Sequence, residues 1–176
     1  MFNKKYAFCG THGVGKSTLL TNIEDIVKYF QIEIINDSSN ARKLKAAGYK
    51  INEEGNDFVE YVVASSHVSN FAKPNHWFAD RCIVDGTAYM LETKCSKACK
   101  QAVINMCKEF SQHYTQIFYI PIEFEMQDDG VRKVDEIYRK KIDTNMKDLL
   151  ENLNNVTIVS GNLSQRRNII QTYLEK

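Results

Sequence analysis

The segment Gly10-Thr11-His12-Gly13-Val14-Gly15-Lys16-Ser17 carries the residue types and spacing that bind a nucleoside triphosphate. It meets the pattern Gly-x-x-x-x-Gly-Lys-Ser/Thr, and it lies between an apolar run and a helical pattern, as that motif requires. Three glycines let backbone N–H groups turn inward towards phosphate oxygens, and the following helix adds its positive end. We therefore predict a phosphate-binding loop rather than a glycine-rich turn without a ligand.

The side chains of this loop have separate expected roles, with ATP and Mg²⁺ as the predicted cofactors. Lys16 should reach the β and γ phosphates, and the Ser17 hydroxyl should ligate Mg²⁺. Thr18 follows them and is placed to touch the α phosphate. The backbone that should hold the remaining phosphate oxygens belongs to Gly10, Gly13, Val14 and Gly15.

Strand-like and helix-like segments alternate around this loop, which predicts a mostly parallel sheet with helices on both faces in an α/β fold. The expected strands are 6–9, 32–35, 77–79, 116–120 and 156–159. The expected helices are 19–30, 41–47, 56–72, a cysteine-bearing segment broken near 93–96, 131–150, and a last helix capped by Ser164. We expect a single domain over 1–176.

Polar residues follow several of these strands. They are Asn36-Asp37, Asp80-Arg81 and Ser160-Gly161. Ligands of open parallel sheets bind beyond the carboxyl ends of the strands, so we expect these residues at one edge with the phosphate loop. Asp80-Arg81 can hold phosphate through the planar guanidinium, or it can be a local ion pair.

Composition restricts the class of partner. The chain has 176 residues, 43% apolar and 26% charged, with a net charge of +1. We therefore expect a soluble cytoplasmic protein with no membrane or nucleic-acid partner, and a homodimer is compatible with the sequence. Three of the five cysteines follow an apolar helical stripe, so we predict reduced core cysteines and no zinc site; they are Cys95, Cys99 and Cys107.

The remaining motifs favour the nucleoside and nucleotide kinases. No guanine-reading Asn-Lys-x-Asp follows a strand, and the chain is short for a motor or transporter ATPase. The segment Asp80-Arg81-Cys82-Ile83-Val84-Asp85-Gly86-Thr87-Ala88-Tyr89 resembles thymidylate kinases and the kinase-like ATPases grouped with nicotinamide riboside kinase. Asp85 matches the second group better, since thymidylate kinases usually have serine there.

The resemblance implies a sheet order of 2-3-1-4-5 and roles for the strand-end residues. Arg81 would hold the acceptor's phosphate or the transferring group, and Asp80 would support Mg²⁺ through water. Asp37 would be the base, although relatives often show Glu before Ala-Arg and this chain has Ser39-Asn40-Ala41-Arg42. Asp37 is also a common type of turn residue at a strand end.

A lid over about 123–140 is also implied, carrying arginines onto the phosphates. Arg132 and Arg139 are seven residues apart, so both are expected on one helix face, away from the apolar stripe. The alternative is a solvated basic face. Gly161 would let backbone pass beside adenine, or is an ordinary turn glycine. Four aromatics can stack on an acceptor base or pack in the core: Phe58, Tyr61, Trp77 and Tyr89.

The function expected from the sequence is therefore a kinase that moves the ATP γ phosphate to a small-molecule acceptor. A nucleoside monophosphate is favoured over a nucleoside or nicotinamide riboside. The catalytic residues would be Lys16, Asp37, Arg81 and Arg132, and the further nucleotide contacts would be Arg139 and Gly161. The rival class is a nucleotide-dependent binding module without transfer activity.

Overall fold

A computed structural model describes residues 3–125 and 135–176. Five strands form one sheet in the order β2-β3-β1-β4-β5, and neighbouring strands pair in parallel. The strands are β1 (Lys5–Cys9), β2 (Glu33–Ile35), β3 (Trp77–Ala79), β4 (Gln116–Tyr119) and β5 (Val156–Ile158). Both the α/β fold and the strand order expected from the sequence are confirmed.

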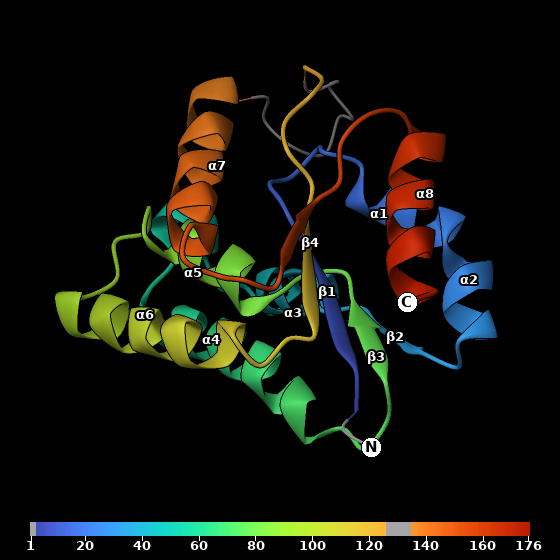
Figure 1. The fold of residues 1–176 in the computed structure, drawn as a ribbon. Helices are drawn as coiled ribbons and strands as arrows, with labels where there is room; N and C mark the ends of the chain where they lie inside the picture. The colour runs from blue at the N-terminus through green and yellow to red at the C-terminus, as the bar shows by residue number, and fades with distance from the viewer. Residues whose placement is uncertain (1–2, 126–134) are drawn as a thin grey trace.

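Helices cover both faces of this sheet (Figure 1). One layer contains α1 (Lys16–Asn22), α2 (Glu24–Tyr29) and α8 (Leu163–Leu174). The opposite side contains α4 (Asp57–Ser69), α5 (Ile83–Met90), α6 (Lys97–Ser111) and α7 (Glu136–Leu150). Helix α3 (Ser38–Ala46) contacts α4, and the short 3-10 turns are η1 (Asn52–Glu54) and η2 (Asn70–Ala72).

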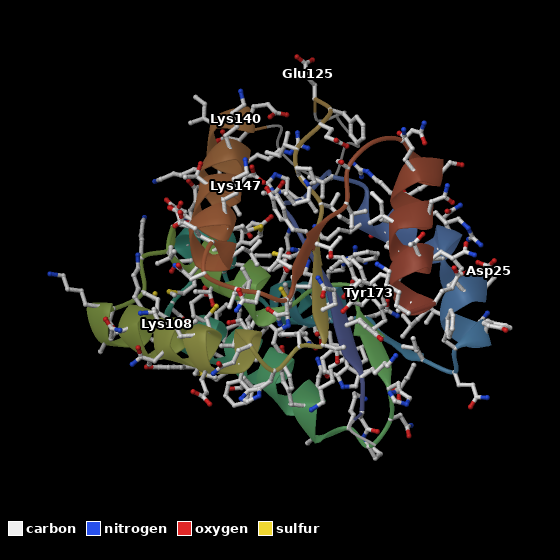
Figure 2. The ribbon with its side chains drawn as sticks, in the orientation of Figure 1. Asp25, Lys108, Glu125, Lys140, Lys147 and Tyr173 are labelled. Carbon is white, nitrogen blue, oxygen red and sulfur yellow. The ribbon has the colours of Figure 1, made fainter. Side chains whose placement is uncertain are left out.

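Each helical layer shares an apolar core with the sheet. On the α1–α8 side, Phe8, Phe78 and Phe118 are fully buried, and the last two rings stack 5.6 Å apart. Tyr173 points from α8 towards the sheet (Figure 2), and its ring meets that of Phe118 edge-on at 5.4 Å. On the other side, Trp77 packs among side chains of α5, α6 and α7. The helices are therefore fixed rigidly against the strands whose ends form the site.

Two details of the helices differ from the expectation. The segment 19–30 is two helices, because the chain turns at Ile23, whose φ of −104° and ψ of 6° leave the helical region. The last helix is capped by Asn162 and not by Ser164: the Asn162 side chain accepts from the N–H of Gln165 at 3.0 Å. Among the described helices, none has the length and apolarity to cross a membrane.

Candidate active site

The phosphate loop connects β1 to α1, and its glycines adopt conformations that other residues rarely take. Gly13 and Gly15 have φ of 73° and 88°. At Gly10 a side chain is excluded by lack of space, because a Cβ would lie 2.7 Å from the backbone oxygen of Ile120. Such a backbone directs successive N–H groups to one side, which forms an anion-binding concavity. The cradle predicted from the motif is therefore present and fits a phosphate chain.

Lys16 is held inside its own loop. Its ammonium donates to the carbonyls of Gly10 and Thr11 at 2.5 and 2.6 Å, and the residue is 8% exposed. Burial, and then the charge of Arg81, lower the pKa of Lys16 to about 7. The hydroxyl-bearing Ser17 and Thr18 are exposed. The residue set fits a Mg²⁺-bound triphosphate, with Lys16 meeting its charge and the Ser17 hydroxyl available to the metal.

Asp80 and Ser17 share one cavity of about 310 Å³, which is also lined by Asn36, Arg42 and Glu24. Asp80 follows β3 and is 6% exposed, and its N–H donates to the carbonyl of Ile35. The ends of β2 and β3 and the first turn of α1 therefore meet at one cavity. This cavity contains Ser17 and Asp80, the two residues predicted to support Mg²⁺.

Arg81 is paired within the site. Its guanidinium lies 3.2 Å from Oδ1 of Asp85, and it also lies over the Tyr89 ring at 5.8 Å. Asp85 is fully buried, and the same oxygen accepts from the N–H of Gly10 at 3.3 Å. One carboxylate thus joins the start of the phosphate loop to Arg81. This ion pair is with Asp85, whereas the alternative considered from the sequence was a pair within Asp80-Arg81.

Asp37 is a buried residue with two side-chain donors. His67 Nδ1 lies 3.2 Å from its Oδ2, and the Asn70 amide donates to the same oxygen at 2.7 Å. The carboxylate is 6% exposed and precedes α3. His67 showed no motif in the sequence, because its partner lies 30 residues away on another element. The sequence analysis named Asp37, but it missed the anchoring of this carboxylate by His67 and Asn70.

Arg139 lies against the phosphate loop and not on an exposed face of α7, so the solvated alternative is wrong for it, and its contact with the phosphates stays a prediction. The residue is 0% exposed. Its guanidinium donates to the carbonyls of His12 and Gly13 at 3.2 and 3.4 Å, and to Glu136 at 2.9 Å. It holds the outer side of the loop while the inner side faces the ligand.

Arg166 does the same from α8, and the sequence gave no signal for it. Its guanidinium donates to the carbonyls of Val14 at 2.7 Å and Gly161 at 2.9 Å, and it pairs with Glu123 at 2.6 Å. Glu123 also accepts from the Gly161 N–H. We call Arg139 and Arg166 the loop arginines, because each bonds to carbonyls of the phosphate loop. Gly161 has φ of 91°, which suits glycine at this turn.

Other expected residues have mixed outcomes. Trp77 is core, whereas Phe58 and Tyr61 are 52% and 40% exposed, so core packing is wrong for those two. The Tyr89 hydroxyl accepts from the His12 N–H at 3.0 Å, so Tyr89 contacts the phosphate loop. Arg132 and the lid residues 126–134 lie outside the described residues. All five cysteines are buried, which agrees with the predicted core positions of Cys95, Cys99 and Cys107.

Comparison with protein families matches residues 5–166 to the family described as AAA domain. The chain belongs to this family. A comparison with curated protein sequences finds no match. Several solved structures share its fold.

Each of the structures described next is aligned over almost the whole chain. One is NadR protein in complex with NR, with a TM-score of 0.73, 20% identity, and coverage of 99% of this chain and 51% of NadR. The other is deoxyadenosine kinase from M. mycoides, with a TM-score of 0.61, 14% identity, and coverage of 97% and 98%. A second NadR structure, in complex with NAD and AMP-PNP, gives a TM-score of 0.72 at 16% identity. This AAA domain protein thus spans about half the length of NadR.

Proposed function

We propose that this AAA domain protein is a kinase that transfers the γ phosphate of ATP to a hydroxyl group of a nucleoside. The observation that carries the proposal is the pairing of Arg81 with the buried carboxylate of Asp85. An arginine that holds an acceptor phosphate needs its charge and its donors for that phosphate. Here the charge of Arg81 is already balanced, which favours an acceptor without a phosphate over the monophosphate expected from the sequence.

Asp37 is proposed as the group that receives the proton of the acceptor hydroxyl. Among the described residues its hydrogen bonds fall on Oδ2, from His67 and Asn70, so that Oδ1 is the oxygen left to take the proton. The residue before it, Asn36, lines the cavity that contains Ser17 and Asp80. A carboxylate placed in this way is suited to general base catalysis.

The donor side needs little covalent chemistry from the protein. When bound, Mg²⁺ would neutralise phosphate charge, and Ser17 and Asp80 are the residues proposed to hold it. Lys16 supplies a second charge, and the loop N–H groups hold the phosphate oxygens. NadR in complex with NR and deoxyadenosine kinase share this fold, which supports a riboside or deoxyriboside as the acceptor class.

The test follows ADP formation from ATP and Mg²⁺ with a panel of nucleosides, nicotinamide riboside and nucleoside monophosphates. We expect a nucleoside to stimulate ADP formation, and Lys16→Ala to abolish it. Asp37→Asn should lower kcat by roughly 10²- to 10⁴-fold without changing ATP affinity. Asp25→Asn, at an exposed carboxylate of α2, is the matched control and should keep full activity.

Two outcomes contradict the proposal. Stimulation by monophosphates alone makes the protein a nucleotide kinase, and Arg81 then has to leave Asp85 when the acceptor binds. Tight ATP binding with no stimulation by any acceptor makes it a nucleotide-dependent binding module instead.

A further inference from the structure

Asp57, Cys95 and Cys99 form a group outside the nucleotide site, and we call it the thiol cluster. One ligand atom from each lies within 4.8 Å of the other two. Asp57 begins α4, Cys95 precedes α6, and Cys99 lies in the first turn of α6. Cys95 and Cys99 are 8% and 0% exposed. Two thiols and a carboxylate are donors that Zn²⁺ takes in proteins, in sites that usually have four ligands.

The positions of these donors are fixed by neighbouring hydrogen bonds. The N–H and the hydroxyl of Ser96 each donate to a carboxylate oxygen of Asp57 at 2.6 Å. The Ser96 hydroxyl oxygen in turn accepts from the N–H of Cys99 at 3.1 Å. Carboxylate ligands of metal ions are commonly oriented by such secondary hydrogen bonds. The arrangement leaves each Asp57 oxygen with a further lone pair for a cation.

Glu60 supplies the fourth candidate donor. Glu60 is 6% exposed, and within residues 3–125 and 135–176 its N–H donates to the carbonyl of Asn56 while its carboxylate makes no hydrogen bond. The carboxylate and Thr93 border the same glycine: a Cβ on Gly55 would meet Glu60 Oε1 at 2.3 Å and Thr93 Cγ2 at 3.3 Å. Thr93 in turn accepts from the N–H of Cys95 at 3.4 Å. A buried carboxylate without a hydrogen bond is costly, and a bound cation at the thiol cluster lowers that cost.

A second group of two thiols and a carboxylate, Cys9, Cys82 and Asp85, has a different charge environment from the thiol cluster. Cys9, Cys82 and Asp85 also lie within 4.8 Å of one another, but Lys16 and Arg81 supply positive charge there. At the thiol cluster the charge of Lys100 reaches Glu60, but its ammonium donates to the carbonyl of Leu91 at 2.7 Å. At the thiol cluster the negative donors therefore outnumber the single positive charge of Lys100. This favours metal binding there over the Cys9, Cys82 and Asp85 set beside the phosphate loop.

We propose that Asp57, Glu60, Cys95 and Cys99 bind one structural Zn²⁺ that joins the start of α4 to the start of α6. Metal–donor bonds of about 2.0 to 2.3 Å place tetrahedral donors roughly 3.5 Å apart. Asp57, Cys95 and Cys99 lie within 4.8 Å of one another and have to approach only slightly, whereas Glu60 lies outside that group and has to turn its carboxylate towards it. Each thiol loses its proton to solvent as its sulfur bonds to the metal. Helix α4 also carries His67, so the ion would stiffen the support of Asp37, and the proposal stands without kinase activity.

The experiment measures metal binding by the reduced, metal-stripped protein. Zn²⁺ affinity is determined by competition with a chromophoric chelator, and Co²⁺ is added separately to detect thiolate-to-cobalt charge-transfer absorption. We expect one Zn²⁺ per chain, the absorption band with Co²⁺, and a higher Tm with Zn²⁺. Cys95→Ser and Cys99→Ser should weaken binding at least about 100-fold, and Glu60→Gln about 10-fold.

Cys107→Ser is the matched control, because Cys107 is a buried cysteine of the same helix outside the cluster. It should bind Zn²⁺ as the wild type does, and circular dichroism establishes that each variant is folded. Folded wild-type protein that binds no Zn²⁺ and gives no cobalt–thiolate band overturns the proposal. Equal Zn²⁺ affinity in wild type and Cys99→Ser also overturns it, because the ion is then held elsewhere.

Discussion

Replacing Arg166 by methionine tests whether the loop arginines hold the phosphate loop in place. The guanidinium is 3% exposed and bonds to two backbone carbonyls and to the carboxylate of Glu123. Methionine keeps much of the apolar volume but supplies no donor. Each hydrogen bond from a charged group contributes about 1.5 to 3 kcal/mol, although Glu123 and part of the backbone can be rehydrated. We therefore expect a loss of roughly 3 kcal/mol in the free energy of unfolding.

The neighbouring residue provides a matched control. Arg167 also forms an ion pair, with Asp25, at 2.6 Å, but both side chains reach solvent. Asp25 projects from the outer side of α2 (Figure 2). Pairs of this kind contribute little, so Arg167→Met should lower Tm by less than about 2 °C. For a chain of this length, the loss at Arg166 corresponds to a Tm decrease of roughly 6 to 12 °C.

Thermal unfolding by circular dichroism measures both variants, and ATP affinity is measured at a temperature where both are folded. Arg166→Met should also weaken ATP binding, because the Val14 carbonyl loses the donor that turns it away from the ligand. Equal Tm decreases in the two variants, or unchanged ATP affinity in Arg166→Met, would refute the reasoning.

Three further predictions concern the loop itself. The pKa of Lys16 is about 7 in the folded protein without nucleotide, against 10.5 ordinarily, so between these pH values the unfolded chain binds more protons than the folded one. The free energy of unfolding should therefore rise with pH across that range in the wild type, and this rise should be absent in Lys16→Met. Phosphate should return the charge to Lys16, so calorimetry near pH 8 in buffers of different ionisation enthalpy should detect proton uptake on ATP binding; identical enthalpies contradict this. Gly10→Ala should abolish ATP binding, because its Cβ meets the Ile120 oxygen at 2.7 Å, whereas Gly48→Ala, with nothing within 4 Å, should cost about 1 kcal/mol and bind ATP normally.

The strands and the phosphate loop could be predicted because their signals are local. Trp77–Ala79 is a short apolar run before a charged pair, and the loop motif specifies its own backbone. The contacts that hold the site residues in place have no such local pattern in the sequence. Asp37 meets His67 across 30 residues, and Arg166 meets Val14 across 152. Only the packing of helices on the sheet brings these partners together.

Arg139 shows how a correct periodicity leads to a wrong environment. Its spacing puts it off the apolar stripe of α7, and the usual inference is solvent exposure. The start of α7 instead lies beside the phosphate loop, whose outward carbonyls need donors. Helical pattern separates apolar from polar faces, but it does not distinguish a polar face in water from one against another backbone.

The loop arginines also set the order in which the protein acquires nucleotide binding during synthesis. The phosphate loop leaves the ribosome before the arginines that donate to its outer carbonyls, which lie 126 to 152 positions later in the chain. Until α8 has emerged and packed, the glycine-rich segment lacks the contacts that fix its curvature. Nascent chains stalled before α8 should therefore fail to be retained on immobilised ATP, and chains stalled after its release should be retained. Nucleotide binding thus reports completion of the fold.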